Sequence, residues 1–107
     1  MVVTDMTFIT TKVDENISIE SGAALTVTGI VNGSIELKAN SKLLMTGITN
    51  GDIIIPEDSL ATVSGIVNGT VMVCGGDACI SGIVTAVKKI SGNLKIEDGA
   101  YVNGQKH

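Results

Sequence analysis

The sequence predicts an all-β chain wound as a single-stranded parallel β-helix, a β-solenoid with about 18 residues per turn. The hexapeptide TGIVNG at 28–33 returns as TGITNG at 46–51 and as SGIVNG at 64–69, so the interval is constant. Aliphatic residues recur at the same interval, and β-branched side chains, which favour strands, are abundant. Aromatic residues make up only 2% of the chain, so Ile, Val, Leu and Ala must fill the interior. Roughly five to six turns are expected from the 107 residues.

Each repeat is too short for two helices but suits short strands joined by corners. When such coils stack about 4.8 Å apart, equivalent side chains form columns that bury one another, which no single coil could do. Four aliphatic columns are predicted: Ile17, Ile35, Ile53 and Val71; Ile19, Leu37, Ile55, Val73 and Ile90; Val27, Met45, Val63 and Ile80; and Ile30, Ile48, Ile66 and Ile83.

The repeated hexapeptide marks a corner. Asn32, Asn50 and Asn68 are expected to stack as a ladder of amide hydrogen bonds. The predicted structural ladder also includes the flanking glycines, Gly29, Gly33, Gly47, Gly51, Gly65 and Gly69. We expect these glycines to supply the positive φ that a tight corner requires. Thr28, Thr46, Ser64 and Ser81 should form a parallel hydroxyl column, and the pairs at 21–22, 39–40, 57–58 and 75–76 should form a second corner.

The whole chain, 1–107, is interpreted as one β-solenoid domain. Residues 1–15 match the repeat poorly and are expected to form an irregular N-terminal cap, with Phe8, Ile9 and Val13 as candidate core members. Regular coils are expected over 16–84 and an insertion over 85–92, because Gly92 falls out of step with the glycine column. The last coil and a C-terminal cap should follow over 93–107.

Two features bear on the family and the hand of the coil. Apolar residues recur every six positions from Ile19 to Val73, which resembles left-handed hexapeptide-repeat helices. The Gly-Ile-Val-Asn-Gly corners and the nearly even spacing of Gly29, Gly47, Gly65 and Gly82 resemble bactofilins over roughly 16–104. That resemblance implies a right-handed triangular β-helix. The hand is left open at this point, with the right-handed form favoured.

Catalytic chemistry has no support in the residue inventory, and the chain is predicted not to be an enzyme. The single histidine, His107, is the last residue, so neither a histidine base nor a zinc site of several histidines can be assembled. Cys74 and Cys79 have no further Cys or His partners and are interpreted as reduced thiols at a corner. We therefore expect no metal and no cofactor.

The formal net charge of −4 and the pI of about 4.7 disfavour binding to nucleic acid or to an anionic membrane. No stretch predicts a signal peptide or membrane insertion, so a cytoplasmic protein is expected. The candidate partner contacts are the exposed charges Glu36, Asp52, Glu57, Asp58, Lys88 and Lys89.

Two hypotheses about function follow. The favoured one is a small acidic protein of the immunity or antitoxin type that binds a basic toxin, such as a nuclease, and blocks it; a rigid solenoid face suits this role. The alternative is a self-assembling cytoskeletal scaffold that polymerises end to end, which the resemblance to bactofilins implies.

Overall fold

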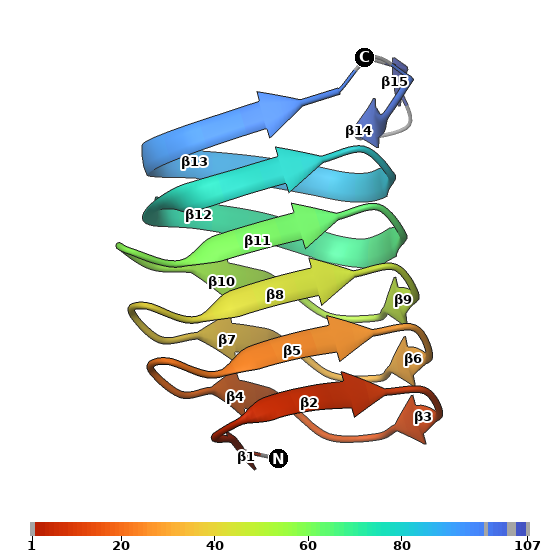
Figure 1. Ribbon diagram of the computed structural model, residues 1–107. Helices are drawn as coiled ribbons and strands as arrows, with labels where there is room; N and C mark the ends of the chain where they lie inside the picture. The colour runs from red at the N-terminus through yellow and green to blue at the C-terminus, as the bar shows by residue number, and fades with distance from the viewer. Residues whose placement is uncertain (1, 98, 103–104, 107) are drawn as a thin grey trace.

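The computed structural model describes residues 2–97, 99–102 and 105–106, and this range is entirely β-strand, turn and loop. Fifteen short and long strands form one continuous sheet that winds into a triangular solenoid (Figure 1). The chain rises from left to right across the near side and returns across the far side, so the winding is right-handed (Figure 1). The predicted β-solenoid is therefore confirmed, with about six turns of roughly 18 residues.

The three sides of the triangle are named here by the strands that build them. The first side holds β1 (Val2–Val3), β4 (Ile17–Ile19), β7 (Ile35–Leu37) and β10 (Ile53–Ile55). The second side holds β2 (Met6–Ile9), β5 (Ala24–Val27), β8 (Lys42–Met45) and β11 (Leu60–Val63). The third side holds β3 (Lys12–Val13), β6 (Ile30–Val31) and β9 (Ile48–Thr49). The long strands β12 (Ile66–Ile80) and β13 (Ile83–Ile96) bend around all three sides. The chain ends in β14 (Tyr101–Val102) and β15 (Gln105–Lys106).

Successive coils pair in parallel, with equivalent residues of the repeat directly above one another. Ile17 pairs with Ile35, Ile35 with Ile53, and Ile53 with Val71, and all four are at most 2% exposed. The column from Val27 to Ile80 is equally buried. The only antiparallel pair among the described strands is β14 with β15, which folds back at the C-terminal end.

The third side differs from the prediction. Ile30, Ile48, Ile66 and Ile83 point outward; Ile30 is 37% exposed and Ile83 49%. The next residue of each coil points inward instead, and Val31, Thr49, Val67 and Val84 are each 0% exposed. Because strands on this side are short and begin with two apolar or β-branched residues, alternation alone could not decide which one faces the core. The hydroxyl of buried Thr49 donates to Met45 Sδ at 3.1 Å.

The irregular N-terminal cap predicted over 1–15 is wrong for the described residues. β1, β2 and β3 pair with β4, β5 and β6, so this segment is a regular first coil. Val3 and Ile9 are buried and Val13 is half-buried, because they continue the inner columns. Phe8 is not a core residue, since it pairs with outward-facing Thr26 and is 63% exposed.

The insertion predicted over 85–92 is also wrong. β13 pairs with β12 through this region, and the interval shortens to 16 residues, as between Asp77 and Asn93. Gly92 lies above Gly75 and Gly76, so it belongs to the second corner and not to the column of Gly29. Ile90 is the single extra residue of a bulge between Lys89 and Ser91, and at 62% exposure it does not continue the column of Val73.

The two glycine columns flanking the asparagines are needed for close packing, not for positive φ. A Cβ on Gly47 would lie 2.0 Å from the Gly29 carbonyl oxygen, and one on Gly51 would lie 2.4 Å from that of Gly33. Positive φ occurs instead at the second corner, as in Gly22 (82°), Asn40 (62°) and Asp58 (60°). Asn and Asp tolerate this conformation better than other residues with a Cβ, which explains why they alternate there with glycine.

The adjacent leucines of β8 offer a matched test of the inner and outer faces. Leu43 is 3% exposed and points inward, whereas Leu44 is 41% exposed and points outward. Leu43→Asp should lower the free energy of unfolding by about 4 kcal/mol or more, because it buries a carboxylate among aliphatic side chains. Leu44→Asp should cost less than about 1 kcal/mol. Denaturant unfolding of both variants checks this, and equal losses would contradict the assigned alternation.

The glycine columns predict a second pair of variants. Gly47→Ala should cost about 3 kcal/mol or more, since its Cβ meets backbone that cannot move without separating two coils. Gly22→Asn should change stability by less than about 1 kcal/mol, because φ is +82° there and nothing lies within 4 Å of the added Cβ. If thermal melts ranked these two variants in the opposite order, the close-approach explanation would be wrong.

Candidate interaction surfaces

The asparagine ladder forms as predicted and runs along the corner after the third side. Asn50 Nδ2 donates to Asn32 Oδ1 at 2.6 Å, and Asn68 Nδ2 donates to Asn50 Oδ1 at 2.7 Å. The ladder begins one coil earlier than predicted, because Asn32 Nδ2 donates to Asp14 Oδ1 at 2.7 Å. Asp14 could have been found by stepping back one repeat from Asn32. Since each amide is already engaged along the column, the ladder is an architectural element.

The hydroxyl column is also present, but its hydrogen bonds differ from a side-chain ladder. Thr46 Oγ1 donates to the Val27 carbonyl oxygen at 2.9 Å, and Thr28, Ser64 and Ser81 donate to the equivalent carbonyls of their own preceding coils. All four hydroxyls are thus engaged by backbone carbonyls, and the single histidine, His107, lies outside the described residues. They consolidate the corner and do not form a nucleophilic site.

A groove of about 650 Å³ runs across four coils of the third side. The glycines at 29, 47, 65 and 82 form its floor, where the absence of side chains leaves space. The outward isoleucine column forms one wall and the hydroxyl column the other. Its surface is mainly apolar and holds no charged side chain, so it offers no group for acid–base chemistry.

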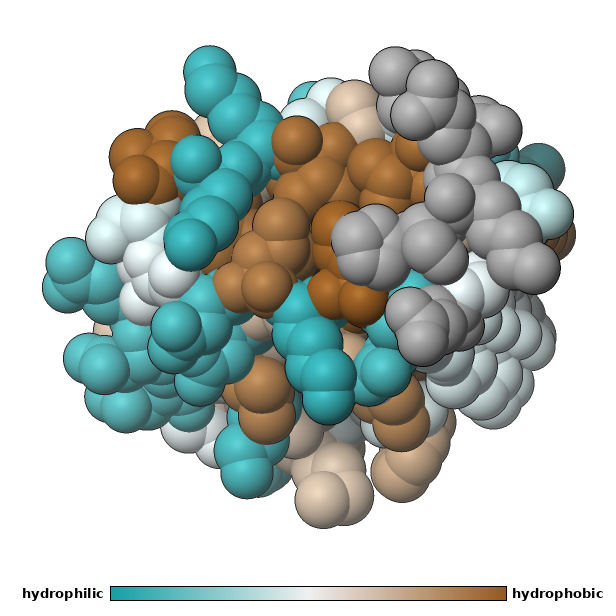
Figure 2. Space-filling model, turned by 90° about the horizontal axis from the view of Figure 1, so that it is seen from above, coloured by the Kyte–Doolittle hydropathy of each residue, from teal (hydrophilic) through white to brown (hydrophobic). Residues whose placement is uncertain are grey.

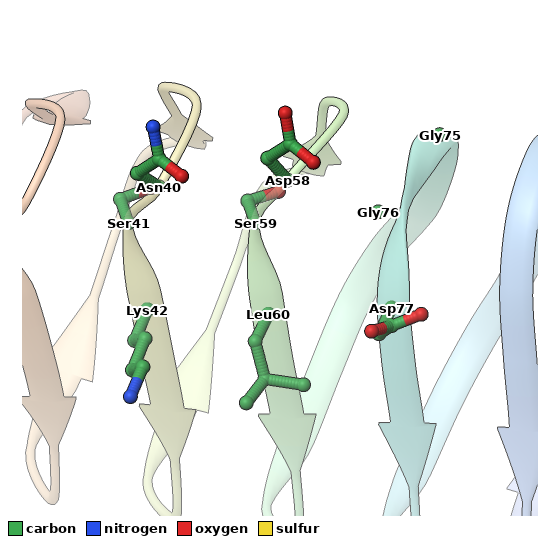
Figure 3. Close-up of a pocket in the computed structure, with 9 residues that line it drawn as sticks. All are labelled: Asn40, Ser41, Lys42, Asp58, Ser59, Leu60, Gly75, Gly76 and Asp77. Atoms are coloured by element: carbon green, nitrogen blue, oxygen red, sulfur yellow. The ribbon is translucent and has the colours of Figure 1, made fainter.

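The second corner carries an open groove of about 440 Å³ (Figure 3). Asn40 and Asp58 project from equivalent turns of successive coils, while the next coil has only Gly75 and Gly76 at this level (Figure 3). The hydroxyl of Ser59 donates to the Pro56 carbonyl oxygen at 2.6 Å, and that of Ser41 donates likewise to Lys38. Two carboxylates, Asp58 and Asp77, and the ammonium of Lys42 also line the groove, and the Asp77 carboxylate accepts from Asn93 Nδ2 at 2.8 Å. Because both hydroxyls are already donated to backbone carbonyls, we assign no catalytic set to this groove.

The four predicted acidic contacts are all exposed but are spread over two corners and one side. Glu36 lies on the outer face of β7 and its carboxylate accepts from Lys38 Nζ at 3.4 Å. Asp52 Oδ1 accepts from the backbone N–H of Thr70 at 2.8 Å, so this carboxylate has a structural role at the corner. Glu57 and Asp58 lie in the second corner. The structure therefore does not gather them into one acidic patch.

Lys88 and Lys89 are both exposed and lie on β13, in the last coil. Lys88 continues the outward column of Met72, whereas Lys89 pairs with Val73 and so occupies the end of an inner column. In the middle of the solenoid such a position would be buried between coils, but in the last coil Lys89 is exposed. This lysine therefore distinguishes the C-terminal end from the middle of the solenoid.

The two ends of the solenoid differ in what they leave uncovered. Among the described strands, only β14 pairs with the outer edge of β13, at Ile83 and Val84, so residues 86–96 present an unpaired edge. Seen from this end, apolar side chains gather at the centre of the last coil, with hydrophilic ones around them (Figure 2). Val87, Leu94 and Ile96 are only partly buried there. At the other end, Val3 and Ile9 are already 2% and 4% exposed.

Sequence reasoning missed four large apolar side chains that are exposed on the second side. Met6 is 72% exposed and Phe8 63%, and Leu44 and Leu60 are 41% and 40% exposed. Their spacing gives the signal, because residues that alternate with buried positions in β2, β8 and β11 must point outward.

Cys79 lies beside Glu97, with its thiol donating to the carboxylate at 3.6 Å. Burial raises the pKa of the Cys79 thiol, and the hydrogen bond and negative charge of Glu97 raise it further, while Lys95 lowers it. A thiol held protonated in this way is a poor nucleophile. Cys74 and Cys79 are both free, in agreement with the reduced state that was predicted.

Within the described residues, no group of three or more His, Cys, Asp and Glu side chains is placed to hold a metal ion. Nor does this part of the chain form a helix with the length and apolar character that crossing a bilayer requires.

Comparison with protein-family models found no match, and neither did comparison with curated proteins or with solved structures.

The environment of Cys79 predicts a change in thiol reactivity. Glu97→Gln removes the carboxylate, so the pKa of Cys79 should fall and the thiolate fraction at a given pH should rise. Alkylation by iodoacetamide at mildly alkaline pH should then be faster at Cys79, while Cys74 should react at an unchanged rate. Peptide mass spectrometry follows each cysteine separately, and Glu57→Gln serves as the control. An unchanged rate at Cys79 would show that Glu97 does not control this thiol.

Proposed function

We propose that this protein is a non-catalytic scaffold whose solenoids associate end to end with copies of the same chain. The observation that carries the proposal is the unpaired edge of β13 over residues 86–96. An open parallel edge presents free N–H and C=O groups, which a strand from another chain can satisfy. The partly buried apolar side chains beneath this edge add a hydrophobic contribution to such pairing.

The first coil supplies a suitable surface for that edge. β1 and β2 are regular strands, and no described strand pairs with their N-terminal edge. On the first and second sides, where β1 and β2 are regular, such a coil can pair with another solenoid without being remodelled, which lowers the cost of association. The resemblance of the Gly-Ile-Val-Asn-Gly corners to bactofilins supports the same function, because bactofilins polymerise end to end.

Binding of a basic protein, as an inhibitor of the immunity or antitoxin type, is a second candidate function. Two observations favour it: the net charge of −4 and the exposed apolar side chains of Met6, Phe8, Leu44 and Leu60 on the second side. Large exposed apolar side chains beside charged ones are typical of protein interfaces. The candidate acidic contacts are dispersed, however, so the open ends of the solenoid support end-to-end association more strongly than the surface charges support binding of a basic protein. A cytoplasmic location suits either function.

Sedimentation velocity over a concentration series from micromolar to near-millimolar tests the proposal. The mean mass should rise with concentration, and negative-stain microscopy of the most concentrated sample should show rods longer than the 34 Å longest dimension of one chain. A chain that stays monomeric over the whole series would contradict end-to-end association. In that case binding of a basic protein remains as the candidate function. The variant Leu44→Lys, which changes the surface of the second side, would then test it.

A further inference from the structure

Building on the proposed end-to-end association, we propose that the contact is polar: the last coil of one copy receives the first coil of the next. The alternative arrangements join two first coils or two last coils. Charge, register and the placement of one lysine distinguish these possibilities.

The two end coils carry opposite charge, although the protein as a whole is acidic. The first coil, residues 2–16, contains Asp5, Asp14, Glu15 and Lys12, which gives a net side-chain charge of −2. The last coil, residues 83–97, contains Lys88, Lys89, Lys95 and Glu97, which gives a net side-chain charge of +2. Stacked coils lie about 5 Å apart, well inside the screening length of about 10 Å at 0.1 M salt. Joining like ends would therefore bring charges of the same sign together, whereas joining unlike ends brings opposite charges together.

The repeat fixes the register of the contact. The outward column that starts at Phe8 passes through Thr26, Leu44, Thr62 and Cys79 and ends at Lys95. If the next copy continues the winding, its Phe8 lies directly over Lys95, and its Ile9 lies over Ile96. An aromatic ring next to an ammonium group is attractive, so the exposed Phe8 gains a partner that it lacks in the single chain.

Lys89 provides a second point of selectivity. It ends the inner column of Val3, Ile19, Leu37, Ile55 and Val73, so an added coil would cover it. A covered ammonium requires a counter-charge, and burying it against an uncharged or basic surface would be costly. Asp5 lies in the corner between β1 and β2, and the equivalent corner of the last coil begins directly after Lys89. An incoming first coil thus brings a carboxylate to the position where the lysine needs it.

The junction involves the first and second sides of the triangle. On the third side, β14 already pairs with β13 at Ile83 and Val84, and β15 pairs with β14 in the antiparallel direction. β15 therefore takes the edge of β14 onto which an incoming β3 would otherwise pair, and the winding is not continued on this side. The open edge at 86–96 faces β1 and β2 of the next copy, which are the strands that carry Phe8 and flank Asp5.

Charge reversal at one end at a time tests the polarity in the full-length chain. We call the first coil the head of the solenoid and the last coil its tail. The tail variant is Lys88→Glu with Lys89→Glu, and the head variant is Thr4→Lys with Asp5→Lys. All four positions are exposed. Every junction of a polar assembly uses one head and one tail, so each variant alone should associate at least ~10-fold more weakly than wild type. An equimolar mixture of the two variants should recover association, because both kinds of mixed junction then join opposite charges. Sedimentation velocity measures all three samples, and thermal melts confirm that both variants are folded.

The matched control for the tail variant is Lys38→Glu with Lys42→Glu, which changes the total charge as the tail variant does, but in the middle of the solenoid. It should associate like wild type. Dimers of wild-type affinity in the tail variant alone would indicate joined heads, and such dimers in the head variant alone would indicate joined tails; either result overturns the polarity. The polarity is also overturned if the mixture of the two folded variants fails to recover association. End-to-end association itself still stands in that case, provided that the wild type assembles. A monomeric wild type overturns both.

Discussion

The structure depends on one constraint: every coil must place its backbone hydrogen bonds directly over those of the coil before it. Parallel pairing at a constant interval satisfies this through the middle of the chain, from Ile17 to Ile35 and from Ile35 to Ile53. The inner side chains then pack in columns, and the corners must let neighbouring backbones approach closely. Glycine at 47 and 65 meets this requirement, because any Cβ would lie 2.0 Å from the carbonyl oxygen below. Core, corners and ladder are all consequences of the same stacking.

Much of the fold could be predicted because repetition makes the signal redundant. The six-residue series from Ile19 to Val73 identifies one inward residue on each side of the triangle, and every member of it is buried. The third side was assigned wrongly because Ile48 and Thr49 are adjacent, and neither hydropathy nor period says which of the two turns inward. Burial of Thr49 runs against hydropathy altogether, and the sulfur of Met45 beside its hydroxyl is the compensating contact.

The C-terminal end could not be predicted as well, because there the repeat loses its regular length. The interval between paired residues is shorter from Val71 to Val87 than in the middle coils, and the bulge at Ile90 shifts the register once more. A sequence reading that holds the interval constant therefore places Gly92 in the wrong column. The opposite charges of the end coils were missed for the same reason, since they emerge only when Lys88, Lys89 and Lys95 are known to share one coil. The asparagine ladder, by contrast, lies in the regular part and was predicted correctly except for its first member.

The asparagine ladder has a consequence beyond its hydrogen bonds, because all its amides point the same way. Each Nδ2–H group is directed toward the N-terminal coil and each oxygen toward the C-terminal one, so the individual dipoles add along the solenoid axis. The positive end of this row meets the carboxylate of Asp14, much as an anion stabilises the start of a helix. The column therefore gives the rod an electrical direction along its surface.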